Sequence, residues 1–147
     1  MITNVKEHKI MTAEMERDNK DLIRAVVKYP GRAPEIVEQS NTLRGYQKVV
    51  NGYIESVPFP GREDEMDIVM NDNGKIDQLE PNIFIPEYRD IFVGPLIAVG
   101  VTPELTWRGL TDEEIRYAVG YFREHECIKE QEYHPERDNG IQNTIEL

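Results

Sequence analysis

The chain contains almost no cysteine, no long apolar run and none of the common catalytic motifs. Its 147 residues include a single cysteine, Cys127, which excludes an internal disulfide framework and fits a reducing compartment. No apolar stretch approaches the ~18 residues that a membrane helix needs, and no basic segment followed by an apolar one opens the chain. We therefore expect a cytoplasmic protein with no membrane partner.

Positive charge is also scarce. Seventeen Lys and Arg residues face 28 Asp and Glu residues, which gives a net charge of −11. Phosphate backbones favour basic surfaces, so we expect no direct binding to nucleic acid. Two explanations of the acidity remain open. It either keeps the protein soluble, or it forms a surface that occupies the basic, nucleic-acid-binding site of another protein.

Length and patterning predict one α+β domain: a small, mostly antiparallel sheet with two helices packed on it. Residues 22–126 form this domain, between a polar N-terminal arm (residues 1–21) and an acidic C-terminal tail (residues 127–147). The domain begins with an expected hairpin, in which Leu22–Lys28 pairs with Glu35–Gln39 across the turn signal Tyr29-Pro30-Gly31.

Two segments carry helix signals. The capping residue types Ser40-Asn41-Thr42 precede a helix with Leu43, Tyr46 and Val50 on one face, and Asn51-Gly52 ends it. Gly45 lies inside this helix, which must therefore depend on packing for its stability. The second helix starts with a capping box, Thr111 to Glu114, and continues with an apolar stripe of Ile115, Ala118, Val119 and Phe122.

The remaining segments are expected to be strands and loops. Tyr53–Val57 and Ile68–Met70 are predicted strands, and Lys75–Leu79 is expected to return as a strand after a tight turn at Asn71–Gly74. Glu80–Arg89 contains two prolines and is expected to be an irregular loop. Ile91–Val101 is the most apolar segment and predicts a central strand, in which Pro95 needs a bulge or a solvent-facing position.

Five segments, taken in order and with their spacing, resemble the domain-of-unknown-function family 3846: AVVKYPGRAPEIVE, TLRGYQKVVNGYIE, IVMNDNGKIDQLEPN, DIFVGPLIAVG and GLTDEEI. The resemblance covers the chain from about Leu22 to Phe122. It implies a small α+β domain and, for many members, carriage by a phage or another mobile element. It implies no reaction and no cofactor.

The chain departs from the family pattern in two places. Asn82 is followed by Ile83-Phe84-Ile85 instead of a basic residue and small apolar residues, which counts against a polar site built around that loop. The extensions before Leu22 and after Glu126 lie outside the pattern, so a function particular to this chain could reside in them.

Metal and catalytic sites are not indicated. His125, Cys127 and His134 form an incomplete set of zinc ligands, and the carboxylates near Asp64 lack the arrangement of a calcium loop. No P-loop, dinucleotide fingerprint or nucleophile elbow is present. We predict no metal, no cofactor and no catalytic residue.

Two sets of residues are candidates for binding. The protein-interaction candidates are acidic side chains of the loop 62–67 together with aromatic and Arg residues: Asp64, Glu65, Asp67, Trp107, Arg108, Tyr117 and Tyr121. If Tyr117 and Tyr121 are exposed together, they mark a contact with a second copy or a target protein. Otherwise they flank the core. The ligand-binding candidates could converge between the sheet and the Asn71–Asp90 loop: Tyr53, Glu55, Asn82 and Arg89.

The sequence thus favours a non-enzymatic, acidic interaction protein of phage or mobile-element type. Its expected partner is a host protein of defence or DNA handling, which it would inhibit in the host cytoplasm, and a homo-oligomer is a further option. The first alternative is a binder of a small, nucleotide-like ligand. The second is an uncharacterised enzyme.

Overall fold

The computed structural model describes residues 21–127. Its main sheet has six antiparallel strands in the order β2-β1-β7-β4-β3, with β8 beside β7. These strands are β1 (Leu22–Lys28), β2 (Glu35–Ser40), β3 (Ile54–Pro58), β4 (Met66–Asn71), β7 (Leu96–Val101) and β8 (Trp107–Arg108). The remaining elements are α2 (Leu43–Val50), α3 (Asp112–Glu124), and a hairpin of β5 (Pro81–Ile85) and β6 (Asp90–Val93) with the 3₁₀ turn η1 (Pro86–Tyr88) between them.

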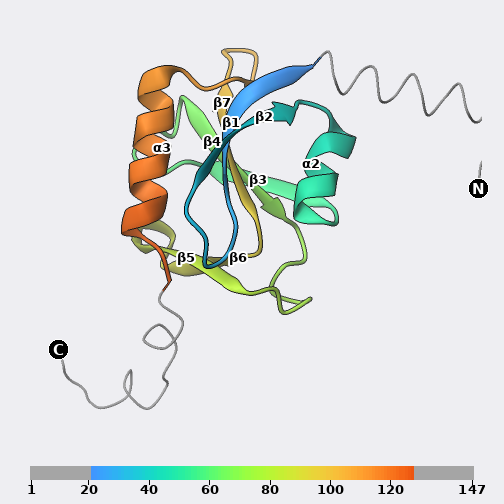
Figure 1. The fold of residues 1–147 in the computed structure, drawn as a ribbon, viewed down its shortest axis with the longest axis vertical. Helices are drawn as coiled ribbons and strands as arrows, with labels where there is room; N and C mark the ends of the chain where they lie inside the picture. The colour runs from blue at the N-terminus through green and yellow to red at the C-terminus, as the bar shows by residue number, and fades with distance from the viewer. Residues whose placement is uncertain (1–20, 128–147) are drawn as a thin grey trace, which may run out of the picture.

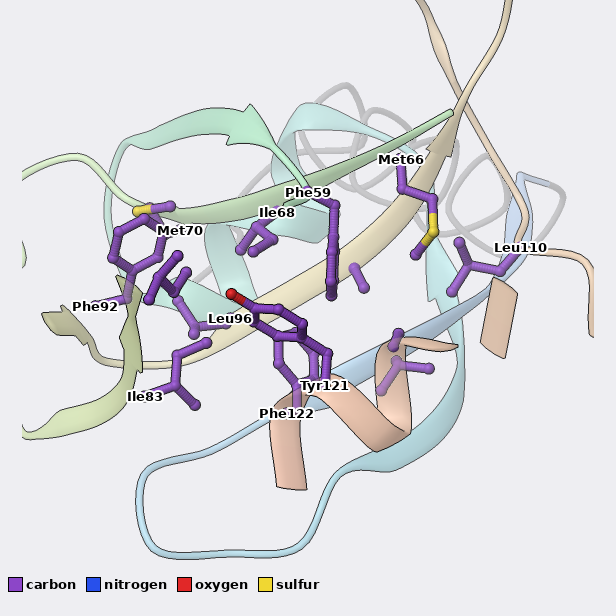
Figure 2. Packing of buried hydrophobic residues seen from close by; sticks show 14 of the residues in the cluster. Phe59, Met66, Ile68, Met70, Ile83, Phe92, Leu96, Leu110, Tyr121 and Phe122 are labelled. Carbon is purple, nitrogen blue, oxygen red and sulfur yellow. The ribbon is translucent and has the colours of Figure 1, made fainter. Parts of the chain in front are cut away.

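The two helices cover opposite faces of the main sheet (Figure 1). Side chains alternate along each central strand, so that Val26 of β1 packs towards α3 while Ala25 and Val27 pack towards α2. The α3 face also carries the residues of the β5–β6 hairpin and the aromatic residues of α3, as Figure 2 shows. The predicted α+β fold, with two helices on a mostly antiparallel sheet, is confirmed.

Local signals explain both helices. The Thr42 hydroxyl accepts a hydrogen bond from the Gly45 amide at 3.0 Å, and Asn51 ends α2 in the left-handed conformation. A Cβ on Gly45 would lie 2.6 Å from Ser40, so this glycine lets the helix approach β2 closely. At α3, the capping box of Thr111 and Glu114 is present as predicted.

Three predictions between residues 71 and 101 were wrong. Residues 75–79 form turns instead of a strand, because the Asn71 side chain accepts from the Asn73 amide and the following amides bond back within the segment. The expected loop 80–89 contains strand β5. The apolar segment 91–101 is split into β6 and β7, because Gly94 adopts a positive φ and Pro95 lies between the strands. Strand β7 is central, as expected.

The remaining expectations on segments stand as follows. The β1–β2 hairpin is confirmed over its full register. Leu43 was expected on the packed face of α2, but its side chain is exposed. The predicted arm and tail lie outside the described residues, apart from Asp21 and Cys127. Among residues 21–127, no helix is long and apolar enough to cross a membrane.

A buried polar network joins the hairpin to the main sheet. Lys28 is fully buried, and its Nζ donates to Asn82 Oδ1 (2.9 Å) and to the Tyr29 carbonyl (3.0 Å) and lies 2.5 Å from Glu126 Oε1. Asn82 Nδ2 donates to the carbonyls of Lys28 and Gly94, both at 2.7 Å. A buried ammonium group is tolerated when it is paired and hydrogen-bonded in this way.

The chain that leaves α3 completes the same junction. The Phe84 amide donates to the His125 carbonyl at 2.9 Å, and the Cys127 amide donates to the Asn82 carbonyl at 3.0 Å. Residues 125–127 therefore lie along β5 as a short extension of the hairpin sheet, with a bridge between Ile83 and Glu126. The network thus connects β1, β5, the turn before β7 and the end of α3.

Replacing Asn82 by leucine should destabilise the fold strongly. The variant removes one of the hydrogen bonds of the buried Lys28 ammonium and takes the Asn82 donor away from the Lys28 and Gly94 carbonyls, at about 3 kcal/mol in total. Urea unfolding measures the loss. The matched control is Asn73→Leu, at an exposed asparagine, which should change the free energy of unfolding by less than about 0.5 kcal/mol. Equal stabilities of the two variants would contradict the role given to the network.

Candidate functional site

A pocket of about 380 Å³ lies between the main sheet and the β5–β6 hairpin. One wall comes from the ends of β3 and β4, the other from η1 and β6, and the turn 72–76 closes it. Its apolar lining includes Val57, Met70, Phe92 and Val93. Met70 and Phe92 belong to the α3-side core cluster and lie at its end farthest from Leu110 (Figure 2). The pocket is therefore a gap at the rim of the core.

The pocket forms because the chain turns sharply after β4. Asn71 is buried, and its Nδ2 donates to the Val50 carbonyl at 3.0 Å while its Oδ1 accepts from the Asn73 amide at 2.7 Å. The following amides then bond back to Asn73 and Gly74, so the segment coils beside the hairpin instead of pairing as a strand. This turn carries Asp72 and Lys75 to the pocket.

Two carboxyl groups stand together at the pocket. Glu55 of β3 and Asp72 of the turn both line it, and their side chains share a hydrogen bond. Partial burial raises the pKa of the Glu55 carboxyl, and the neighbouring Asp72 raises it further through charge repulsion and that hydrogen bond. The Glu55 carboxyl therefore keeps its proton to a higher pH than an isolated glutamate does, because its pKa is raised.

The remaining charges at the pocket form an ion pair. Lys75 of the turn contacts Asp90 at the start of β6, and both side chains are partly exposed. This pair connects the two walls, but an exposed ion pair contributes only about 0–1 kcal/mol. Among the described residues that line the pocket, three carboxyl groups thus face one ammonium group: Glu55, Asp72 and Asp90 against Lys75.

The structure places the four predicted ligand-binding residues differently. Glu55 lines the pocket, which lies between the sheet and the Asn71–Asp90 segment as the sequence suggested. Tyr53 is 72% exposed outside the lining, and Arg89 is exposed beside it at the end of η1. Asn82 is fully buried in the network with Lys28, so it is not available to a ligand.

Trp107 and Arg108 make contacts within the domain. The Trp107 Nε1 donates to Asp67 Oδ2 at 2.9 Å, and its ring packs edge-to-face on Tyr46 with centroids 4.9 Å apart. Burial raises the pKa of the Asp67 carboxyl, while the hydrogen bond from Trp107 opposes the rise. Arg108 forms a two-pronged contact with the buried carboxylate of Glu114, at 2.9 and 3.0 Å. Both residues hold β8 in place.

Of the two alternatives for Tyr117 and Tyr121, an exposed pair or residues that flank the core, the structure shows the second. Tyr121 is buried; its ring stacks on His125 at 3.8 Å between centroids, and its hydroxyl donates to Glu87 at 2.7 Å. Tyr117 is half-buried and donates to the Pro60 carbonyl at 2.7 Å. Phe59 packs against both rings, so the side of α3 that carries Tyr117 and Tyr121 is also in contact with the core.

The loop 62–67 is braced from within. Arg62 contacts Glu65 at 3.1 Å and Glu113 of α3, and its guanidinium lies 4.5 Å above the Tyr117 ring centre. Asp64 is exposed and Glu65 is tied to Arg62. Of the candidates in this loop, Asp64 projects most freely towards solvent.

Metal binding and catalysis were not expected. No group of three or more His, Cys, Asp or Glu side chains within residues 21–127 is arranged to hold a metal ion, and His134 of the suggested zinc set lies outside this range. The carboxyl pair of Glu55 and Asp72 is a titratable arrangement beside a cavity, which sequence reasoning did not select. The absence of catalytic residues therefore stays a prediction.

The comparisons with known proteins define the family. Residues 23–123 match the family model described as domain of unknown function (DUF3846), and the chain belongs to this family. No curated protein and no solved structure matches the chain. The resemblance seen in the sequence is thus confirmed for the family, while the activity has to be argued from the pocket.

Several pocket residues were missed in the sequence: Val57, Met70, Asp72, Lys75, Asp90 and Phe92. Val57 and Met70 are part of predicted strands, and their alternation with polar neighbours gave one usable signal. Asp72 and Lys75 were assigned only to a tight turn. The pairing of β5 with β6 brings Asp90 and Phe92 to the site, and the prolines had hidden that pairing.

Replacing Glu114 by glutamine should weaken the fold in a pH-dependent way. Hydrogen bonds from Arg108 hold the pKa of the Glu114 carboxyl below its usual value of 4.5. A lowered folded-state pKa contributes stability above the unfolded-state pKa, and the contribution is lost as pH falls through the folded-state value. We expect Glu114→Gln to lose about 1–2 kcal/mol at pH 7, and the gap from wild type to close in acid. Urea unfolding across pH measures this, with exposed Glu124→Gln as the control. A gap that is constant with pH would contradict the assignment.

Proposed function

We propose that this domain binds a small organic ligand in the pocket between the main sheet and the β5–β6 hairpin. The observation that carries the proposal is the pocket itself, about 380 Å³ with an apolar floor and a few polar groups at its rim. Ligand sites in proteins commonly have this size and this composition. An interior at normal packing density leaves few gaps larger than a water molecule, so a gap this large supports a binding role.

The pocket walls suit a ligand that is partly apolar. Val57, Met70, Phe92 and Val93 offer hydrocarbon and aromatic surface, and Tyr88 adds a ring stacked on Phe92 at 5.9 Å between centroids. The Tyr88 hydroxyl is occupied by a hydrogen bond to the Pro58 carbonyl at 2.7 Å. This bond ties η1 to the end of β3, so the two walls are already linked before a ligand binds.

A nucleotide-like ligand has less support than a ligand without phosphate. Such a ligand would need a local positive site from Arg89 or Arg108. Arg108 is engaged by Glu114, and neither arginine lines the pocket. Among the described residues of the lining, Lys75 carries the only ammonium group, and it is paired with Asp90. We therefore propose ligands without phosphate groups.

Filling the pocket should abolish binding without unfolding the domain. Val57 is half-buried on the edge strand β3, where an aromatic residue is tolerated, and Val57→Phe places a ring in the cavity. The matched control is Ser56→Phe on the same strand, whose side chain points to the opposite face. A mixture of benzyl alcohol, benzylamine and phenylacetate at millimolar concentration serves as the probe.

The measurement is the methyl resonance of Met70 in NMR spectra, together with mass spectrometry of small molecules released from the purified protein. We expect at least one fragment to shift the Met70 methyl signal in wild type and Ser56→Phe, and none to shift it in Val57→Phe. If no fragment moves this signal in wild type and the protein releases no ligand, the proposed function is wrong.

Binding of a basic protein surface is the second candidate function. Its support is the braced loop 62–67, which holds Asp64 outward on a chain of net charge −11. In this role the loop and its neighbouring carboxylates would occupy a phosphate-binding surface of a host protein. Fixed acidic groups at a rigid loop favour fast, salt-sensitive association with a basic partner.

A charge-matched pair of variants tests this second function. Asp64→Lys should lose a partner captured from host lysate, because it places a positive charge in the loop. Glu104→Lys changes the net charge equally but lies in the β7–β8 turn, and should retain the partner. Raising the salt concentration should release the partner from the wild-type protein. A partner that is retained at high salt, or that is lost equally in both variants, would exclude the charge-based form.

A further inference from the structure

We infer that the ligand is an organic cation, whose ammonium or guanidinium group is held between the carboxyl groups of Glu55 and Asp72. The inference depends on the proposed function, since it names the ligand class of the same pocket. The apolar floor cannot select the charge of a ligand, so the rim must do so. Among the described lining residues the rim is dominated by carboxyl groups.

The groups that face Glu55 come from two further elements besides its own strand. The turn 72–76 contributes Asp72 and Lys75, and the hairpin contributes Tyr88 and Asp90. Lys75 and Asp90 neutralise one another as an ion pair across the pocket. The Tyr88 hydroxyl is used by the Pro58 carbonyl. Glu55 and Asp72 are therefore left as a carboxyl pair for which no basic residue of the lining supplies a counter-charge.

A cation relieves the repulsion within this pair. Two adjacent carboxylates disfavour double ionisation, and an ammonium or guanidinium group placed between them donates charge-assisted hydrogen bonds to the oxygens of both. The aromatic side chains of Phe92 and Tyr88 line the same pocket and offer a cation–π surface to such a ligand. The same carboxyl groups would repel an anionic ligand.

A metal ion fits the site less well than an organic cation. No set of three or more metal-ligating side chains is assembled within residues 21–127, and hard cations prefer six or more oxygen ligands. The wall beside the carboxyl pair is apolar, and a hydrated metal ion gains nothing from it. An amine or guanidine with a hydrocarbon or aromatic body uses both halves of the pocket.

Binding should release a proton and strengthen as the pH rises. In the free protein the pKa of Glu55 lies above its ordinary value, so part of the population is protonated in weak acid. A bound cation favours the ionised carboxylate and lowers this pKa. Below the range where Glu55 titrates, the cation must displace a proton, and its affinity falls.

The test compares small aromatic probes of different charge on the full chain, including one cation without an N–H donor (benzyltrimethylammonium) to separate the effect of charge from that of hydrogen bonding. Benzyltrimethylammonium and benzylamine are the cations, benzyl alcohol is the neutral probe and phenylacetate is the anion. Affinities come from titrations of the Met70 methyl signal between pH 5 and pH 8, a range in which both cations stay charged and which lies above the ordinary glutamate pKa of 4.5. Variants Glu55→Gln and Asp72→Asn remove the carboxylates, and Glu104→Gln is an exposed control outside the pocket.

We expect the cations to bind about tenfold more tightly than benzyl alcohol at pH 7, with affinity that falls in acid. Glu55→Gln and Asp72→Asn should remove this preference and leave the affinity for benzyl alcohol unchanged. Equal binding of cation and alcohol, or tighter binding of phenylacetate, would overturn the inference while the ligand pocket stands. If no probe binds to wild type, the proposed function fails, and the inference fails with it.

Discussion

The buried contact between Lys28 and Asn82 decides whether the pocket exists. One wall of the pocket belongs to the main sheet and the other to the β5–β6 hairpin, whose strands form a separate two-stranded sheet extended by residues 125–127. Asn82 anchors the hairpin by bonding the backbone on two sides, at Lys28 and at Gly94. Because each of these buried groups needs its partner, the hairpin has one low-energy position. The cavity is the space that this position leaves.

The same constraint explains why the pocket lies where it does. Both faces of the main sheet are covered by helices, and the alternating side chains of β1, β4 and β7 fill the two cores. A cavity within either core would cost packing energy directly. The edge strand β3 pairs with β4 on one side only, and its residues Glu55 and Val57 line the pocket. Here the fold presents apolar surface next to carboxyl groups.

Sequence reasoning found the parts of the fold that depend on neighbouring residues. The caps at Thr42 and Thr111 and the β1–β2 hairpin follow from local chemistry, and local chemistry is visible in the sequence. Prediction from the sequence failed where contacts between distant segments determine the structure. Two prolines made residues 80–89 look irregular, although Pro81 and Pro86 lie at the start and just after the end of β5. Tyr121 looked free because nothing near it in sequence shows that Phe59 covers that side of α3.

The ion pairs within the domain determine where the net charge of −11 has an effect. Four basic side chains form ion pairs with carboxylates of the domain itself: Lys28, Arg62, Lys75 and Arg108. Each of them neutralises the carboxylate next to it and has little effect on the rest of the surface. Carboxyl groups outside such pairs then determine the local potential. At the pocket this leaves Glu55 and Asp72 together beside an apolar wall, where a lower effective dielectric constant strengthens their field. The electrostatic potential at the pocket is therefore set by the carboxyl groups of Glu55 and Asp72 more than by the net charge of the whole chain.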